Sequence, residues 1–151
     1  MGTAIKVENF STADKEEVLD LLGEAELPLD DLTDEKMKNF MVAKNKDDRV
    51  VGVVGLETYQ DSGLLRSLAV HPAYRRTGLG RLLTRKIESY ARHRGINYLY
   101  LLTMTAADFF SKIGYEVTPR DNLPEAIRKT EEFKNLCPVS AKCMAKVLDS
   151  A

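Results

Sequence analysis

Arginines and glycines lie close together between residues 75 and 81 of this sequence. The arginines are Arg75, Arg76 and Arg81, and the glycines are Gly78 and Gly80. Glycine lets the backbone approach a ligand closely, and a helix starting here leaves its first N–H groups without intrahelical acceptors. Those donors, the positive end of the helix dipole and the guanidinium charges together favour a pyrophosphate. The spacing by itself predicts a site for a phosphate-bearing ligand.

Two other well-known phosphate-binding motifs are absent from the sequence. The sequence contains no G-x-x-x-x-G-K-[ST] segment, which argues against a P-loop. It also has no G-x-G-x-x-G segment after its first expected strand, which argues against a dinucleotide-binding fold.

The arginine–glycine segment stands between an expected strand and an expected helix. Residues 64–70 predict the strand, and an amphipathic pattern predicts a helix from about Arg81 to His93. Residues 50–59, rich in β-branched side chains, predict a strand that forms a hairpin with residues 64–70. The apolar run 98–103 predicts a further, buried strand.

The remaining pattern predicts a single domain over residues 1–151 with an α/β (α+β) fold. We expect a mixed, mostly antiparallel sheet of about six to seven strands, with helices on both faces. The other expected elements are a strand near Ile5 and Val7, a helix after Ser11-Thr12, a helix after Thr33 with Met37, Phe40 and Met41 on one face, a short helix from about Thr105 to Gly114, a strand over 115–118, a helix over 125–135 and a strand over 141–148.

Composition narrows the classes of function. The 151 residues are 44% hydrophobic and 30% charged, with a formal net charge of −1, so no basic excess suggests a nucleic-acid partner. The longest apolar runs are too short to span a bilayer, and the first ten residues lack the apolar core of a signal peptide. We therefore expect a cytoplasmic protein with no membrane partner. The two cysteines and two histidines show no zinc-ligand spacing, so no metal site is expected.

The segment Arg75-x-x-Gly78-x-Gly80 resembles the acetyl-coenzyme A motif R/Q-x-x-G-x-G/A of the GNAT family of N-acetyltransferases. The residues before it, Leu68-Ala69-Val70-His71-Pro72-Ala73-Tyr74-Arg75, are similar to that family's approach to the motif. Phe109 to Tyr115 resembles its closing helix and Gly-aromatic turn. The resemblance implies an acetyl-CoA-dependent N-acetyltransferase with a splayed central pair of strands.

Two subgroups show a narrower resemblance. Residues 101–106 with Phe109 and Phe110 are similar to the acetyltransferase domain of N-acetylglutamate synthases. Residues 64–70 and 136–141 are similar to ArsN-type acetyltransferases of arsenic-resistance operons. Both imply a small, amino-acid-like amine as the acceptor.

The GNAT resemblance also implies roles for particular residues. The backbone N–H of Val70 would bind the thioester carbonyl, where such a donor stabilises the oxyanion by roughly 3 kcal/mol. The pantetheine arm would pair with the backbone of residues 68–70, and the pyrophosphate would lie on residues 76–81. The cofactor-binding residues implied are Leu68, Ala69, Val70, Arg75, Arg76, Thr77, Gly78, Leu79, Gly80, Arg81, Thr105 and Phe110.

The sequence departs from the family at the acid that protonates the departing thiolate. The family often has a tyrosine four residues before the glycine of the Gly-aromatic turn, and here that position is Phe110. A thiol with a pKa of about 8.5 is a fair leaving group near neutrality without an acid. Water, Tyr59 or Tyr115 could replace the acid, and packing as buried aromatics is the alternative for both tyrosines.

The attacking amine needs a base of the carboxylate or imidazole type. Glu57 is the first candidate, unless it is a solvent-facing strand residue; His71 is the second, unless it is a hydrogen-bonded loop residue. Arg66 stands in an otherwise apolar strand and would share a face with Leu64 and Leu68 if no bulge intervenes.

The fork of donors on Arg66 suits a substrate carboxylate or a phosphonate-like group. An edge position or an ion pair with Glu57 is the alternative for Arg66. Thr103 could bind substrate, and Thr105 cofactor; capping of the following helix is the alternative for both.

Alternative interpretations of the cysteines, the activity and the oligomeric state stay open. Cys137 and Cys143 could chelate a soft metalloid, but small buried residues or one reactive thiol are the simpler explanation. Transfer to a protein or peptide is a second enzyme hypothesis. A non-catalytic sensor that binds acetyl-CoA is a third hypothesis, because Phe110 stands where the family often has its catalytic acid. The protein would be a monomer or a homodimer.

Overall fold

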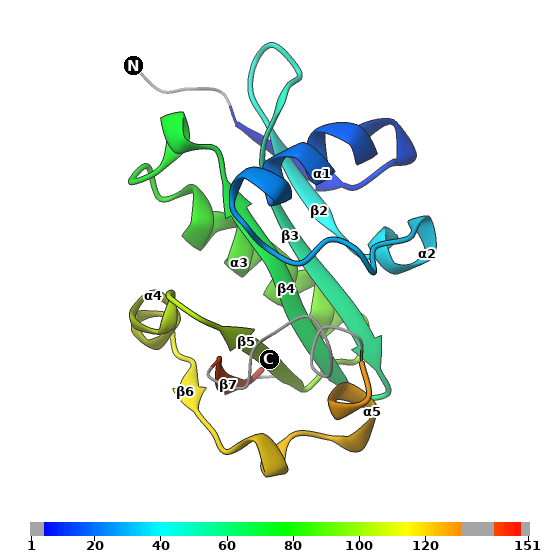
Figure 1. Ribbon diagram of the computed structural model, residues 1–151, viewed down its shortest axis with the longest axis vertical. Coiled ribbons are helices and arrows are strands. Elements are labelled where there is room, and N and C mark those ends of the chain that lie inside the picture. Colours follow the sequence, from blue (N-terminus) through cyan, green and yellow to red (C-terminus); the bar gives the residue numbers. More distant parts are fainter. Residues whose placement is uncertain (1–4, 131–140, 149–151) are drawn as a thin grey trace. The chain divides into compact units, whose positions relative to one another are not determined.

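The computed structural model of the chain describes residues 5–130 and 141–148. Figure 1 shows its strands and helices. The strands are β1 (Lys6–Asn9), β2 (Met41–Lys44), β3 (Val50–Tyr59), β4 (Ser62–Val70), β5 (Tyr98–Thr103), β6 (Glu116–Val117) and β7 (Lys142–Val147). The α-helices are α1 (Lys15–Glu24), α2 (Asp34–Met37), α3 (Leu79–His93), α4 (Ala107–Lys112) and α5 (Glu125–Arg128).

The strands form a seven-stranded sheet in the order β1-β2-β3-β4-β5-β7-β6. Antiparallel pairs join β1 to β2, β2 to β3, β5 to β7 and β6 to β7, whereas β4 and β5 are parallel. The predicted mixed, mostly antiparallel sheet is therefore confirmed. The register of β4 with β5 pairs Ser62 to Leu64 with Tyr98 to Tyr100; a splay of the two strands beyond those residues stays a prediction.

The described residues fall into two compact units, each with its own apolar cluster. One unit holds residues 5–56 and 67–89, and the other holds residues 57–66, 90–130 and 141–148. They are called unit 1 and unit 2 below and are described separately.

The core of unit 1 forms where α1 lies over β2 and β3 (Figure 1). Val18, Leu21 and Leu22 recur at helical spacing and are buried against Val42 and Val53. A short 3-10 helix, Thr12–Asp14, leads into α1, and the Asp14 carboxylate accepts hydrogen bonds from the N–H and hydroxyl of Ser11. The predicted helix after Ser11-Thr12 is thus present and begins with a capped turn.

The helix predicted after Thr33 is shorter than expected. Thr33 caps α2 by accepting the N–H of Lys36 at 3.2 Å, but α2 ends at Met37. Met41 begins β2 and pairs with Val54, so placing it on a helix face was wrong. The apolar spacing imitated a helix because Met37 and Phe40 are both buried in the same cluster.

Gly55 of β3 makes room for the ring of Phe40. A Cβ atom at Gly55 would come within 2.5 Å of Phe40 Cε1 and Cζ. The residues next to them, Met41 and Val54, are cross-strand partners. The glycine therefore lets an aromatic ring cover the strand at the start of β2.

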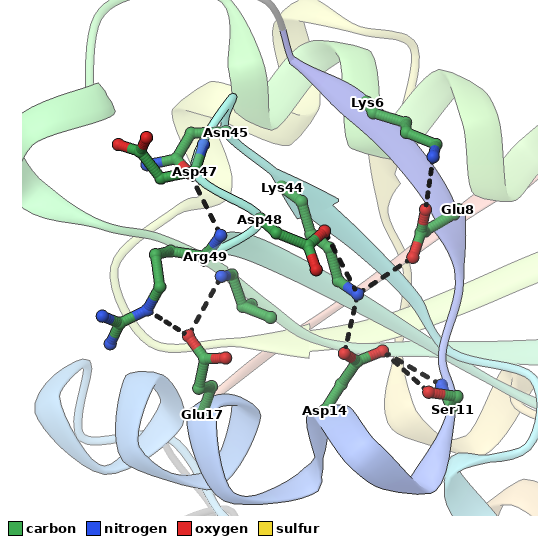
Figure 2. A network of polar contacts seen from close by, with 11 residues as sticks. Lys6, Glu8, Ser11, Asp14, Glu17, Lys44, Asn45, Asp47, Asp48 and Arg49 are labelled. Carbon is green, nitrogen blue, oxygen red and sulfur yellow. Dashed lines mark hydrogen bonds and ion pairs between the residues drawn. The ribbon is translucent and has the colours of Figure 1, made fainter.

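A cluster of charges joins β1, the 3-10 helix before α1, and β2 within unit 1 (Figure 2). The ammonium of Lys44, whose side chain is 12% exposed, lies 2.9 Å from Asp14 Oδ1 and 3.0 Å from Glu8 Oε2. Hydrogen bonds to Asp14 and Glu8 raise the pKa of Lys44, and the hydrogen bond to Lys44 lowers the pKa of Glu8. The buried Asp14 is therefore balanced by a lysine that is itself almost enclosed.

One apolar cluster of unit 2 lies beside β5 and β7. Its buried residues are Leu64, Leu123, Ile127 and Cys143, and Tyr59, Tyr100 and Leu102 pack against it. The strand predicted at 98–103 is confirmed as β5, but its complete burial was wrong, because Tyr98 is 40% exposed. Residues 131–135 of the expected last helix lie outside the described residues.

In the part of the chain that the structure describes, no helix has both the length and the apolar character needed to cross a membrane.

We expect Lys44→Met to lower the free energy of unfolding by about 2 kcal/mol near neutral pH, because it leaves the buried Asp14 without its lysine. The pKa of Glu8 is lowered, so its share of the stabilisation exists above the ordinary carboxylate range and is lost on acidification. The pKa of Lys44 is raised, so its share exists below the ordinary lysine range and is lost in strong alkali.

Urea denaturation across pH measures this difference between the two proteins. It should be largest near neutrality and should shrink in acid as the carboxylates protonate. Lys6→Met, at a lysine whose side chain is 77% exposed, is the control and should change stability by less than about 0.5 kcal/mol. A Lys44→Met penalty that is small, or that grows in acid, would contradict the account.

Candidate functional site

The strand before the arginine–glycine segment is not regular. Ser67, in the middle of β4, has φ +59°, a left-handed conformation that is unusual for a serine inside a strand. Such a residue interrupts the alternation of side chains, as in a bulge. The alternation from Leu64 through Arg66 to Leu68, expected only if no bulge intervenes, therefore does not continue past Ser67.

The last three residues of β4, which follow this irregularity, are buried to different extents. Ala69 is buried, whereas Leu68 and Val70 are half-buried. The Val70 carbonyl accepts a hydrogen bond from Arg75 Nε at 3.3 Å, and the N–H of the next residue, His71, donates to the Val51 carbonyl at 2.8 Å. The end of β4 is thus fixed in position within unit 1.

A 3-10 helix, Pro72–Tyr74, turns the chain from β4 into the loop. His71 caps it, with Nδ1 accepting the N–H of Ala73 at 3.1 Å. This geometry matches the loop role considered for His71. The hydroxyl of Thr77 donates to the Tyr74 carbonyl at 2.5 Å and closes the loop on itself.

The residues that follow adopt backbone conformations suited to holding an anion. Arg76 has φ +64° and Gly78 has φ +86°. Alternating left- and right-handed residues turn successive N–H groups toward one side of the chain, which favours an anion there. A Cβ atom at Gly78 would meet no atom within 4 Å, so this stretch of backbone faces open space.

Helix α3 begins directly after Gly78, two residues earlier than predicted. It runs for 15 residues from Leu79 to His93, and the first bond of its ladder joins the Leu82 N–H to the Gly78 carbonyl at 3.0 Å. The N–H groups of Leu79, Gly80 and Arg81 precede that bond and have no intrahelical acceptor. Arg75, Arg76, Thr77 and Arg81 are all exposed here. Unit 1 therefore brings the predicted pyrophosphate-binding residues together at one helix end.

Unit 2 contains a buried ion pair. The guanidinium Nη1 of Arg66 lies 2.7 Å from Glu57 Oε2, and the two side chains are 0% and 6% exposed. The hydroxyl of Tyr59 donates a hydrogen bond to the other oxygen, Glu57 Oε1. The possibility of a solvent-facing Glu57 is thus wrong, and the ion pair considered for Arg66 is present.

The two threonines predicted near β5 differ. Thr103 Oγ1 accepts the N–H of Ala106 at 2.9 Å, so it caps the turn that enters α4. Thr105 lies in that turn and is exposed. A substrate contact from Thr103 and a cofactor contact from Thr105 both stay predictions.

Helix α4 places Phe110 in an aromatic cluster. Phe110 is 5% exposed and meets Tyr115 edge-to-face at 5.5 Å and Phe109 at 5.1 Å between ring centroids. The Tyr115 N–H donates to the Phe110 carbonyl at 3.0 Å. This agrees with the packing role that sequence analysis gave as the alternative for Tyr115.

Lys146, which no sequence pattern indicated as functional, supports the turn after α4. Its ammonium donates to the Ile113 carbonyl at 3.0 Å and lies 5.4 Å from the centroid of the Tyr115 ring. A lone lysine on an expected strand, more than 30 residues from its partners, gives no sequence signal for such a contact.

Cys143 is buried, and its burial raises the pKa of the thiol. A neutral thiol is a poor nucleophile and a poor metal ligand. Cys137 lies outside the described residues, so chelation by both cysteines stays a prediction. Within residues 5–130 and 141–148, no group of three or more His, Cys, Asp or Glu side chains could hold a metal ion.

A family model supports the resemblance seen in the sequence. The acetyltransferase (GNAT) domain matches residues 36–117, which include β2 to α4 and the whole arginine–glycine loop.

Individual relatives are similar in sequence or in fold. An amino-acid acetyltransferase of Pseudomonas putida is 30% identical over 139 residues, which cover 83% of this chain and 32% of that protein. The Neisseria gonorrhoeae N-acetylglutamate synthase, solved with coenzyme A and N-acetyl-glutamate, superposes with a TM-score of 0.84 at 22% identity. That match covers 99% of this chain and 36% of the synthase chain.

A GNAT-family acetyltransferase of Staphylococcus aureus superposes with a TM-score of 0.79 at 21% identity, covering 97% of this chain and 100% of the other. The chain thus spans about a third of the length of the first two relatives and all of the third.

We predict strong energetic coupling between Glu57 and Arg66. In a double-mutant cycle of Glu57→Gln and Arg66→Met, the coupling in the free energy of unfolding should exceed about 1.5 kcal/mol, because the two charges are buried side by side. Tyr59→Phe, which removes the hydroxyl that donates to Glu57, should cost about 1 kcal/mol. Guanidinium chloride denaturation measures all four proteins of the cycle. Coupling below about 0.5 kcal/mol would mean that the pair is broken in solution.

Proposed function

Because the chain belongs to the acetyltransferase (GNAT) domain family, we propose that it transfers the acetyl group of acetyl-CoA to the amine of a small, amino-acid-like substrate or toxin. The whole of residues 1–151 would act as a single catalytic domain. Acetyl-CoA supplies an acetyl group activated as a thioester. The amine nitrogen bonds to the acetyl carbon as the carbon–sulfur bond breaks, the amine proton goes to a base, and CoA leaves as the thiolate.

The observation that carries this proposal is the loop before α3. Arg76 and Gly78 have positive φ angles directly before the unsatisfied N–H groups of the helix. Exposed arginines flank them, and the space that a Cβ at Gly78 would occupy is open. These features fit a bulky pyrophosphate, which needs several N–H donors, positive charge and a close approach to the backbone.

The residues of β4 fit the rest of the cofactor. The half-buried Leu68 and Val70 flank the buried Ala69 at the end of the strand. The backbone of these residues would pair with the pantetheine arm. The Val70 N–H would hold the thioester oxygen and stabilise the negative charge that develops on it. Thr105 and Phe110, which belong to unit 2, are also proposed as cofactor contacts.

Proton transfer would use the polar groups of unit 2. Glu57 is the proposed base, directly or through a water molecule, and Arg66 and Tyr59 hold its carboxylate in place. The departing thiolate needs no strong acid near neutral pH. Tyr59, Tyr115 or water would supply a proton where one is needed, because the family's usual tyrosine is Phe110 here.

The acceptor class is argued from Arg66 and from the relatives. A buried guanidinium in an apolar strand suits recognition of a carboxylate, and Glu57 orients it. Amino-acid acetyltransferases are among the proteins similar to this chain. Thr103, at the end of β5, would contact the same substrate. A non-catalytic acetyl-CoA sensor is the second candidate, since Phe110 replaces the usual acid.

The two ends of α3 offer a matched test of cofactor binding. Gly78 and Gly95 both have positive φ, +86° and +82°, and a Cβ at either would meet no atom within 4 Å. Replacement by alanine should cost about 1 kcal/mol of stability at both positions, because the strain is the same. Only Gly78→Ala should weaken CoA binding, by about tenfold, because its Cβ occupies the side from which the pyrophosphate approaches.

Isothermal titration of CoA into the wild type and the two variants measures this difference. Equal losses in both variants would place the pyrophosphate elsewhere. No CoA binding by the wild type would refute the proposed cofactor.

Arg66→Lys tests the acceptor class. The assay measures released thiol with acetyl-CoA and an amine panel of amino acids, their carboxamides, amino-acid-like phosphorus and arsenic toxins, and a lysine peptide. The wild type should prefer an amino acid to its carboxamide. Arg66→Lys should reduce that preference by about tenfold, because a lysine cannot form the bidentate contact. Its Kd for CoA should stay unchanged.

A preference unchanged in Arg66→Lys would remove Arg66 from substrate recognition. A response to the peptide alone would move the function to protein acetylation. CoA binding without turnover on any amine would favour the sensor.

A further inference from the structure

Asn45, in the turn between β2 and β3, is bonded on both ends of its side chain. Its Oδ1 accepts the N–H of Asp47 at 2.9 Å and the N–H of Arg49 at 3.0 Å. Its Nδ2 donates to the hydroxyl of Tyr74 at 3.2 Å, across 29 positions of sequence. One side chain thus joins this turn to the residue at which the arginine–glycine loop starts.

The turn that carries Asn45 is firmly held. The backbone N–H of Asn45 donates to the Arg49 carbonyl at 3.0 Å, and the Asp48 N–H donates to the Asn45 carbonyl at 2.9 Å. Glu17 of α1 accepts from Arg49 Nε and from the Val50 N–H, both at 3.1 Å (Figure 2). The amide of Asn45 is therefore fixed relative to α1 and β3 before it reaches Tyr74.

Tyr74 in turn controls the shape of the loop. Its ring lies edge-on to His71, with 6.2 Å between centroids, and its N–H donates to the His71 carbonyl at 2.8 Å. Its carbonyl accepts the hydroxyl of Thr77, the residue directly before Gly78. The contacts form a continuous path from Asn45 through Tyr74 and Thr77 to the first turn of α3.

We propose that Asn45 is a positioning residue for the pyrophosphate end of acetyl-CoA, acting through its hydrogen bond to Tyr74. The inference rests on the proposed function, since it needs the loop to hold that pyrophosphate. The loop residues Arg75 and Arg76 are exposed, and Arg76 holds a left-handed conformation that an arginine alone does not favour. A contact that fixes Tyr74 reduces the number of conformations that the free loop can adopt. Less conformational entropy is then lost when the ligand orders the loop, so the affinity rises.

Tyr74→Phe and Asn45→Ala test this role from the two sides of the bond. Each should raise the Kd for CoA by about fivefold, the effect of one neutral hydrogen bond. The double variant should lose no more than the larger single loss, because both changes remove the same contact. Asn45→Asp should bind nearly as well as the wild type, because its carboxylate keeps the turn bonds and accepts from the Tyr74 hydroxyl.

Matched controls remove similar bonds elsewhere. Asn122→Ala removes an amide-to-hydroxyl bond of 3.3 Å to Thr118, and Tyr90→Phe removes a bond of 2.6 Å from Arg94. Both should keep the wild-type Kd. Thermal unfolding of every variant shows whether a loss of affinity follows a loss of fold; Tyr74→Phe should unfold close to the wild-type temperature.

Fragments of the ligand separate positioning from a general structural effect. In competition experiments against CoA, the Tyr74→Phe change should weaken the binding of adenosine diphosphate by the same factor as it weakens the binding of CoA. Acetyl-pantetheine, which lacks the pyrophosphate, should keep its wild-type competition constant. An equal loss for acetyl-pantetheine, or an unchanged Kd for CoA in Tyr74→Phe, would overturn the inference while leaving the proposed function intact. Absence of CoA binding by the wild type would overturn both.

Discussion

The first turn of a helix exposes N–H groups that have no acceptor within the helix. In α3 of this protein, those groups come directly after a loop whose conformation is fixed by several contacts. Gly78 and Arg76 take left-handed conformations, Thr77 closes on the Tyr74 carbonyl, and Asn45 holds Tyr74 from the β2–β3 turn. The adjacent arginines add charge, which would make an unliganded loop unfavourable unless an anion completes it. The fold of unit 1 supplies rigid support for this arrangement.

Unit 2 contains a different kind of polar arrangement. Its polar centre is the Glu57–Arg66 pair, in which one carboxylate binds a guanidinium and a tyrosine hydroxyl at the same time. Such a pair contributes little net stability but fixes the direction of both side chains. Acetyl transfer to an amine that also carries an acid group would use both side chains. The carboxylate of Glu57 would lie near the amine, and the guanidinium of Arg66 would lie near the acid group of the substrate.

Much of the fold could be predicted because strong periodicity marks its longer elements. The amphipathic pattern of α3, the β-branched run of β3 and the apolar run of β5 each gave the right element within about two residues. β2 was missed because four residues carry too little pattern and the buried Met37 and Phe40 beside it share a helical spacing. An irregularity in β4 was left open as a possibility, since nothing in the local pattern marks the left-handed φ of Ser67.

The candidate site was less predictable than the fold. The loop before α3 was predicted as a candidate phosphate site because closely spaced glycines and arginines give backbone access and positive charge. The Glu57–Arg66 pair was foreseen as an alternative, because a hairpin brings the two strands together. The contacts of Asn45 with Tyr74 and of Lys146 with Tyr115 join residues far apart in sequence, and nothing in the local pattern specifies them.

The most direct test of the account is a titration of CoA into isotope-labelled protein, followed by the amide resonances of the backbone. We expect the largest shifts at residues 68–70 and 77–81, at the end of β4 and around the first turn of α3. Shifts confined to other parts of the chain, or no change at saturating CoA, would contradict the central claim that this loop holds the cofactor.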